Sequence, residues 1–288
     1  MLSTVQNRAF FRLRQINSRR PRYRSKQIQG GGLLRVNNYE TTNAFIWRFG
    51  TWEPGLTNYL LRNVRSGDKF IDIGANIGYY SVLAASLGAK PIAFEPLPSV
   101  LKQLRQNFEL NGIDVSGIKP YAIGAECRTA MIYEGPTLNR GRSSVAGPPV
   151  KQSSDSAKFE INVRPLEFFS DDLRNAKFIK IDVEGLETEV LKSVLENLEV
   201  FDPALTILVE IREDEKDRPA AGSIETIMSR FRQAGFAFRV VENRYDLTFY
   251  RRAISGNYRE WTPETVDDLI ELMQERGMID LILSRQNV

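Results

Sequence analysis

The chain has 288 residues, of which 42% are hydrophobic and 26% are charged, a composition typical of a globular protein with one or two domains. It has no histidine and a single cysteine, Cys127, which argues against a disulfide framework, a zinc enzyme and every mechanism that uses histidine. It has no run of 18 apolar residues, so we expect no transmembrane helix.

The formal net charge of +3 is distributed unevenly along the chain. Residues 1–30 hold eight basic residues and no acid, a charge of +8 that leaves −5 for the remainder. We interpret residues 1–32 as a basic N-terminal arm with a hinge at QGGG (29–32), and residues 33–288 as a single domain. We expect a cytoplasmic protein whose arm meets an anionic partner, with an organelle-targeting segment as the alternative.

Strands and helices alternate along the domain. After a helix that begins near Pro54, we predict strands over 69–74, 90–96 and 117–124, with helices over 78–88 and 97–112. A second series follows: strand 177–183, helix 186–198, strand 204–211, helix 223–236, strand 237–242, helix 262–277 and strand 278–285. Residues 125–165 alternate weakly around an inserted loop at 134–156 that is rich in Gly, Pro and Ser. This order predicts an α/β fold, a mostly parallel sheet with helices on both faces.

A glycine-containing turn, DIGANIG (72–78), joins the first of these strands to its helix. In such folds, ligands bind beyond the carboxyl ends of the strands. Gly74 allows a tight turn and close approach of the backbone to a ligand, and Gly78 permits close helix packing. The dinucleotide fingerprint G-x-G-x-x-G is absent, and Asp72 suits a ligand with an ammonium group better than a pyrophosphate. Glu95, which ends the next strand, can accept hydrogen bonds from both hydroxyls of a ribose.

The stretch KIDVEGLE (180–187) places a lysine inside an apolar strand and several acids at its carboxyl end. A buried lysine requires a charged partner, for which we expect Asp182 or Glu184. Glu187 falls in the first helical turn, where the helix dipole favours an acid. Without histidine, the deprotonation of an alcohol would need a carboxylate or a lysine whose pKa is lowered by burial. We predict that Asp182 or Glu184 is the base, with Lys180 assisting.

Four segments, DKFIDIGANIGYYSVLAA, AFEP, NFELNG and IKIDVEGLETEVLKS, resemble the FkbM-type S-adenosylmethionine-dependent methyltransferases, and the resemblance covers residues 52–210. It implies the class I (Rossmann-like) methyltransferase fold, whose seven-stranded sheet ends in an antiparallel strand. It also implies O-methylation of a hydroxyl on a sugar, glycolipid or natural product. The residues that it places against S-adenosylmethionine are Glu53, Asp72, Gly74, Asn76, Gly78, Glu95, Ala122 and Ile123.

We expect the small-molecule or glycan acceptor to bind beside the inserted loop, through side chains that can bond to phosphate, carboxylate or sugar hydroxyls: Arg140, Arg142, Ser143, Ser144 and Glu210. We assign no metal; the alternative is Mg²⁺ held by Asp182, Glu184 and Glu210. Two other functions stay open. One is an RNA methyltransferase whose basic arm binds the phosphates of RNA; the acidic charge of the domain argues against this function. The other is a catalytically inactive cofactor-binding protein whose tail binds anionic membrane or nucleic acid.

Overall fold

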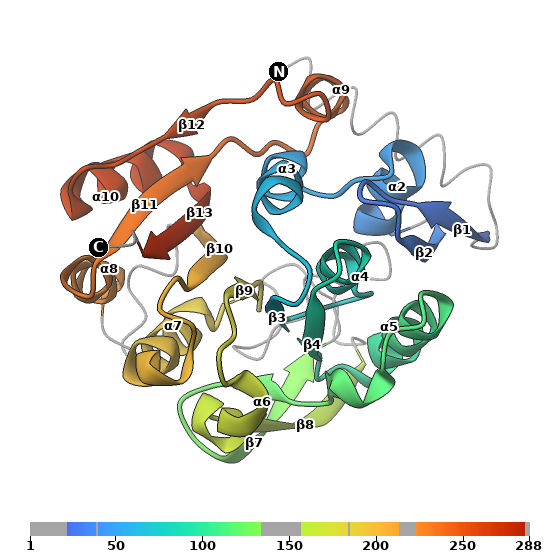
Figure 1. Cartoon of the computed structure of the whole chain (residues 1–288), viewed down its shortest axis with the longest axis horizontal. Coiled ribbons are helices and arrows are strands. Elements are labelled where there is room, and N and C mark those ends of the chain that lie inside the picture. The colour runs from blue at the N-terminus through green and yellow to red at the C-terminus, as the bar shows by residue number, and fades with distance from the viewer. Residues whose placement is uncertain (1–21, 39, 134–156, 184, 213–222, 286–288) are drawn as a thin grey trace.

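The computed structural model of the chain describes residues 22–38, 40–133, 157–183, 185–212 and 223–285 (Figure 1). Its main sheet has eight strands. From edge to edge they are β12 (Glu260–Trp261), β11 (Phe236–Val241), β13 (Met278–Arg285), β10 (Thr206–Arg212), β9 (Phe178–Ile181), β3 (Lys69–Ile73), β4 (Lys90–Phe94) and β5 (Ile118–Lys119). Strands β10, β9, β3, β4 and β5 are parallel, whereas β13 lies antiparallel between β10 and β11. This is the predicted class I methyltransferase sheet with its antiparallel last strand, extended at one edge by the two-residue β12.

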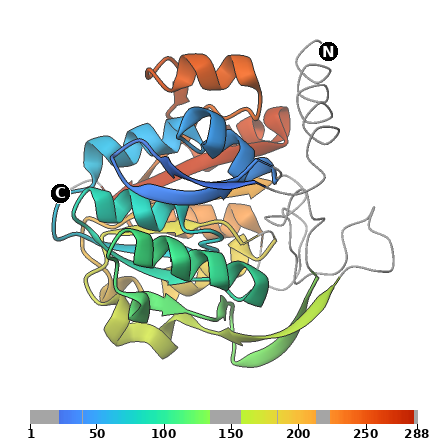
Figure 2. The ribbon, with the colours of Figure 1, turned by 90° about the vertical axis from the view of Figure 1, so that its right-hand side faces the viewer.

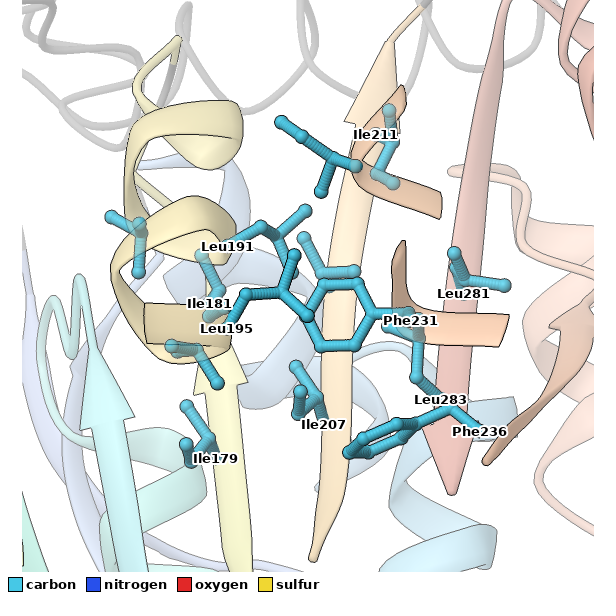
Figure 3. Close-up of a cluster of buried hydrophobic side chains, with 14 of the residues drawn as sticks. Ile179, Ile181, Leu191, Leu195, Ile207, Ile211, Phe231, Phe236, Leu281 and Leu283 are labelled. Carbon is cyan, nitrogen blue, oxygen red and sulfur yellow. The ribbon is translucent and has the colours of Figure 1, made fainter. Parts of the chain in front are cut away.

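Helices cover both faces of the sheet (Figure 1). One face carries α7 (Glu187–Glu196), α8 (Ile224–Gln233) and α10 (Val266–Arg276); the other carries α3 (Pro54–Asn63), α4 (Tyr79–Ser86) and α5 (Pro98–Leu110). Figure 3 shows the core under the first group, where Phe231 of α8 and Leu191 of α7 pack over Ile207 of β10. Burial on both faces explains why these strands are almost continuously apolar.

Because side chains alternate along a strand, every second side chain of these strands lies on the face opposite this core. Ile179 and Ile181 of β9 pack under α7 and α8, whereas Phe178 contacts the opposite cluster, on the side of α3 and α4. Because side chains alternate along a strand, Lys180 lies on the same face as Phe178. The same reasoning places Glu210 of β10 and Asp280 of β13 on that face, beside Leu208 and Ile282. Three charged residues embedded in apolar strands therefore share one side of the sheet.

The N-terminal part of the domain differs from the sequence interpretation. Residues 22–32, which we expected in the basic arm, contain strand β1 (Tyr23–Gln27) and a turn into β2 (Leu33–Asn37), and the two strands form an antiparallel hairpin (Figure 2). The side chains of Leu34 and Val36 are fully buried in the core beside α3 and α4. The glycines expected as a hinge thus lie in the turn of a packed hairpin. Residues 1–21, with most of the basic charge, lie outside the described residues.

The strand predicted over 117–124 is divided in two. Proline has no N–H to donate to a sheet, and Pro120 separates β5 from β6 (Ala122–Ile123). Strand β6 belongs to a second sheet with β8 (Lys158–Arg164) and β7 (Arg128–Tyr133), which flank the inserted loop.

The sequence interpretation also missed α2 (Thr41–Phe49) and α9 (Leu247–Ala253). The short helical segments are η1 (Val115–Gly117), η3 (Leu166–Phe169), α6 (Ser170–Leu173) and η4 (Leu198–Val200). Within the described ranges, every helix is too short or too polar to span a membrane.

Candidate functional site

A cavity of about 570 Å³ lies at the carboxyl ends of β3, β4, β9 and β10. Its volume is within the range of pockets that bind small molecules. These four strands are parallel, so the residues that follow each of them reach the same edge of the sheet. Other parts of the chain also contribute to the wall, among them the segment 121–123 and the residues Trp52, Glu53 and Tyr245.

The glycine loop after β3 touches the loop after β9. Gly74 has φ +81°, and a Cβ atom there would lie 1.8 Å from the backbone oxygen of Asp182. Only glycine permits this approach. The carboxylate of Glu95 accepts hydrogen bonds from the N–H of Asn76 at 2.9 Å and the N–H of Leu97 at 2.8 Å. Burial raises the pKa of Glu95 to about 7, against the effect of these two hydrogen bonds. Glu95 therefore joins the loop after β3 to the loop after β4.

Asp72 lies beneath the first turn of α4. Its Oδ2 accepts hydrogen bonds from the N–H of Ser81 at 2.9 Å and from the Ser81 hydroxyl at 2.6 Å. Burial raises its pKa to about 6, although the bonds from Ser81 lower it.

Gly78 has a different role, because a Cβ atom there would lie 2.6 Å from a methyl of Leu104 on α5. Gly78 therefore permits helix packing and is not among the residues that line the cavity. The other cofactor-binding residues expected from the sequence do line it: Glu53, Asp72, Gly74, Asn76, Glu95, Ala122 and Ile123.

Lys180 is fully buried between two acids. Its Nζ lies 3.9 Å from a carboxylate oxygen of Glu53 and 3.9 Å from one of Asp182. Burial alone would lower the pKa of the ammonium, but Glu53, Asp182, Asp280 and Glu210 more than offset that effect and raise it. The alternative of a lysine base with a lowered pKa therefore does not apply to Lys180, which stays protonated at neutral pH.

Asp182 is more accessible than its ion-pair partner Lys180. Its side chain is 34% exposed, and it lines the cavity. Burial raises its pKa, the Lys180 ammonium lowers it, and the Glu210 carboxylate raises it again. An acid with a raised pKa is a stronger base when ionised, so this environment suits proton abstraction near neutral pH. Glu184, the alternative base, lies outside the described residues.

Glu53 is the centre of a buried hydrogen-bonding network that the sequence did not reveal. Its Oε2 accepts from the hydroxyl of Tyr80 at 2.5 Å, and its Oε1 accepts from the hydroxyl of Tyr245 at 3.0 Å. Burial raises the pKa of Glu53. Tyr245 and Glu53 are 192 positions apart, so no local pattern could join them. The Tyr245 hydroxyl also lies 3.0 Å from Oε2 of Glu210, whose other oxygen pairs with Arg212 at 2.8 Å.

Two further interpretations from the sequence concern Glu187 and the inserted loop. Glu187 lies in the first turn of α7 and accepts a hydrogen bond from the N–H of Gly185 at 2.8 Å, as its interpretation as a helix-start acid implies. The acceptor-binding loop residues lie outside the described residues: Arg140, Arg142, Ser143 and Ser144.

Comparisons with known proteins point to one family. The family model "Methyltransferase FkbM domain" matches residues 72–238, more than half of the chain. Methyltransferase sdnD from Sordaria araneosa is 27% identical over 195 residues, which cover 56% of this chain and 73% of that protein. Methyltransferase 1 from Beauveria bassiana is 25% identical over 194 residues, which cover 60% and 74%. Among solved structures, M. jannaschii TYW2 in complex with AdoMet is similar at a TM-score of 0.42 and 12% identity, covering 93% of this chain and 86% of that one.

Proposed function

This chain belongs to the FkbM methyltransferase family, which uses S-adenosylmethionine, and we propose that it methylates a hydroxyl oxygen of a sugar, glycolipid or natural product. The observation that carries the proposal is the position of Asp182. Its carboxylate is partly exposed in the cavity, is paired with Lys180, and belongs to a loop in close contact with Gly74. A proton acceptor therefore lies next to the glycine loop, where a methyl donor would bind.

The cavity residues fit this cofactor. Acids surround the place where the cationic methionine end would lie, and the backbone at Gly74 leaves no room for a side chain. In our assignment Asp72, Gly74 and Asn76 hold the methionine end and Glu95 accepts hydrogen bonds from the ribose hydroxyls. Ala122 and Ile123 contact the adenine, and Glu53 orders the part of the wall formed by Tyr80, Tyr245 and Lys180. When bound, S-adenosylmethionine supplies a methyl group that is already activated for displacement.

Asp182 then acts as the general base. An alcohol is a poor nucleophile while it keeps its proton, and a carboxylate with a raised pKa removes that proton efficiently near neutral pH. Lys180 remains charged and orients the Asp182 carboxylate from 3.9 Å. The alignment of the acceptor oxygen with the methyl group supplies the rest of the rate enhancement. Glu184 stays the alternative base.

Two measurements on the purified chain test this assignment. Calorimetry with S-adenosylmethionine should show saturable binding that Asp72→Ala abolishes and Asp182→Asn preserves. Transfer of a labelled methyl group to sugars, glycolipids and hydroxylated natural products should then be lost in Asp182→Asn or in Glu184→Gln. Full turnover in both variants would show that the base is elsewhere. The absence of cofactor binding at millimolar concentration would refute the proposed function as a whole.

We further propose that the 134–156 loop belongs to the same domain and contacts the acceptor, together with Glu210. Arginine can bind phosphate or carboxylate with two parallel hydrogen bonds, and serine can bond to sugar hydroxyls. Replacing Arg140 or Arg142 with alanine should raise KM for the acceptor and leave the affinity for the cofactor unchanged. Unchanged KM in the double variant would place the acceptor elsewhere.

A further inference from the structure

Three buried acids meet at one wall of the cavity, and we refer to Glu53, Glu210 and Asp280 as the carboxylate cluster. One carboxylate oxygen from each lies within 4.8 Å of the others. Glu53 precedes α3, whereas Glu210 and Asp280 stand directly opposite each other on the antiparallel strands β10 and β13. Like charges in directly opposed positions of two strands repel each other, so this pair requires compensation.

Asp280 is the member of the cluster whose environment is incomplete. Its side chain is 1% exposed, and among the described residues neither of its carboxylate oxygens has a hydrogen-bond partner. The other two acids are bonded: Glu53 to Tyr80 and Tyr245, and Glu210 to Arg212 and Tyr245. A buried carboxylate is normally paired with a charge, bonded to several donors or bound to a metal.

The charges around the cluster do not balance. The contacts within 4 Å connect Glu53 and Asp182 to Lys180, and Glu210 to Arg212. With Asp280, four acids of the described residues face two basic groups, a formal excess of two acids. The single hydroxyl hydrogen of Tyr245 cannot serve Glu53 and Glu210 at once, although its oxygen lies 3.0 Å from both.

We propose that the carboxylate cluster binds a hard divalent cation of the class of Mg²⁺, Mn²⁺ and Ca²⁺, through one oxygen each of Glu53, Glu210 and Asp280. Such ions prefer oxygen ligands, and their double positive charge favours the ionised form of acids that are crowded together. Ligand oxygens lie about 2.1 Å from Mg²⁺ and about 2.5 Å from Ca²⁺, so oxygens on opposite sides of an ion are roughly 4–5 Å apart. Three ligands spread evenly around such an ion are about 3.6–4.3 Å apart, so oxygens within 4.8 Å of one another reach one ion with side-chain shifts of less than about 1 Å.

This site goes beyond the proposed function, since methyl transfer to an alcohol requires no metal ion. It also differs from the arrangement that the sequence suggested, a Mg²⁺ ion held by Asp182, Glu184 and Glu210. Only Glu210 belongs to both sets. Because Glu53 and Glu210 line the cavity, the remaining ligands of the ion would be water or oxygen atoms of a bound molecule.

The test is direct binding of the ion to the whole chain. Protein treated with EDTA and then dialysed is titrated with CaCl₂ and MgCl₂ in a calorimeter, and with MnCl₂ by electron paramagnetic resonance. We expect one ion per chain and a rise in the unfolding temperature at saturation. Asp280→Asn should weaken ion binding by at least about tenfold. Removing a residue that is hydrogen-bonded to a metal ligand already lowers metal affinity about 10–100-fold, and removing a ligand itself should lower it no less. The exposed Asp267→Asn on α10 is the matched control and should bind the ion as the original chain does.

A second variant, Glu210→Gln, keeps the test decisive if Asp280→Asn does not fold. The proposal is overturned if the original chain binds none of the three ions at about 10 mM, well above the weakest calcium sites of proteins. It is also overturned if every folded cluster variant binds them with the original affinity. Cofactor binding and methyl transfer, measured on the EDTA-treated chain, report separately on the proposed function.

Discussion

Replacing Gly74 with alanine tests the contact between the glycine loop and Asp182. The alanine Cβ would lie 1.8 Å from the Asp182 backbone oxygen, whereas such contacts are essentially never below 3.0 Å. The two loops must therefore separate by more than 1 Å. This movement strains the hydrogen bonds from Gly74 N–H to Phe94 and from Asp182 N–H to Ile73, each 2.9 Å long.

The expected loss of stability has two parts. An alanine at φ +81° costs about 1–2 kcal/mol, because the left-handed region is unfavourable for residues with a Cβ atom. Forcing atoms into a packed region costs about 1–3 kcal/mol more. Gly67→Ala separates the two parts, since Gly67 has φ +89° and no described atom within 4 Å of the added Cβ. We therefore expect a loss of about 2–5 kcal/mol for Gly74→Ala and only about 1–2 kcal/mol for Gly67→Ala.

Urea unfolding of both variants and calorimetry with S-adenosylmethionine measure these effects. Gly74→Ala should also lower methyl transfer by about 100-fold or more, because it displaces the proposed base by about 1 Å. Gly67→Ala should keep the original cofactor affinity and turnover. The reasoning is refuted if the two variants are equally stable and Gly74→Ala still binds the cofactor and turns over as before.

Two further predictions concern buried charges. Lys180→Met should destabilise the chain by about 3–5 kcal/mol at pH 7, since it leaves Glu53 buried without its cation, and by less at pH 5. Lys192 is half-exposed, so the control variant Lys192→Met should change the unfolding free energy by less than about 0.5 kcal/mol. If urea unfolding gives the same loss of stability for both lysine variants, the buried ion pairs of Lys180 do not contribute as described. The pKa of Glu95 is raised from 4.5 to about 7, so between these values the folded chain keeps a proton that the unfolded chain has lost. The unfolding free energy relative to Glu95→Gln should therefore fall by about 3 kcal/mol as the pH rises through this window, and a constant difference would show that Glu95 is not desolvated.

The order of elements was predictable because the strands are buried on both faces. Short apolar runs such as 69–74 and 278–285 match β3 and β13 closely, and the glycines that end the strands and helices mark their limits. Local patterns failed where packing against distant residues decides the structure. Strand β1 looked like part of a basic arm because it carries Arg24 and Lys26, while the buried side chains of the hairpin, Leu34 and Val36, belong to β2.

The sequence could predict the part of the candidate site whose residues lie at the ends of individual strands. Asp72, Gly74 and Glu95 lie at strand ends, so the rule that ligands bind beyond the carboxyl ends placed them together. The network around Glu53 was not predictable. It depends on Tyr80 from a helix and Tyr245 from the segment between β11 and α9, and neither residue differs in local pattern from an ordinary core tyrosine.

Asp280 shows how far the reasoning applied to Lys180 extends. A charged residue inside an apolar strand requires a partner, and this principle applies equally to the acid in MIDLILSR. What the sequence lacked was the order of the strands. Only when β13 lies antiparallel beside β10 does Asp280 stand opposite Glu210, on the face that also carries Lys180. Two acids then face each other, and the basic groups described beside them are already engaged, Lys180 by Glu53 and Asp182 and Arg212 by Glu210. Among the described residues, the excess of acids at this point thus follows from the sheet topology, and it is the reason that we propose a divalent cation there.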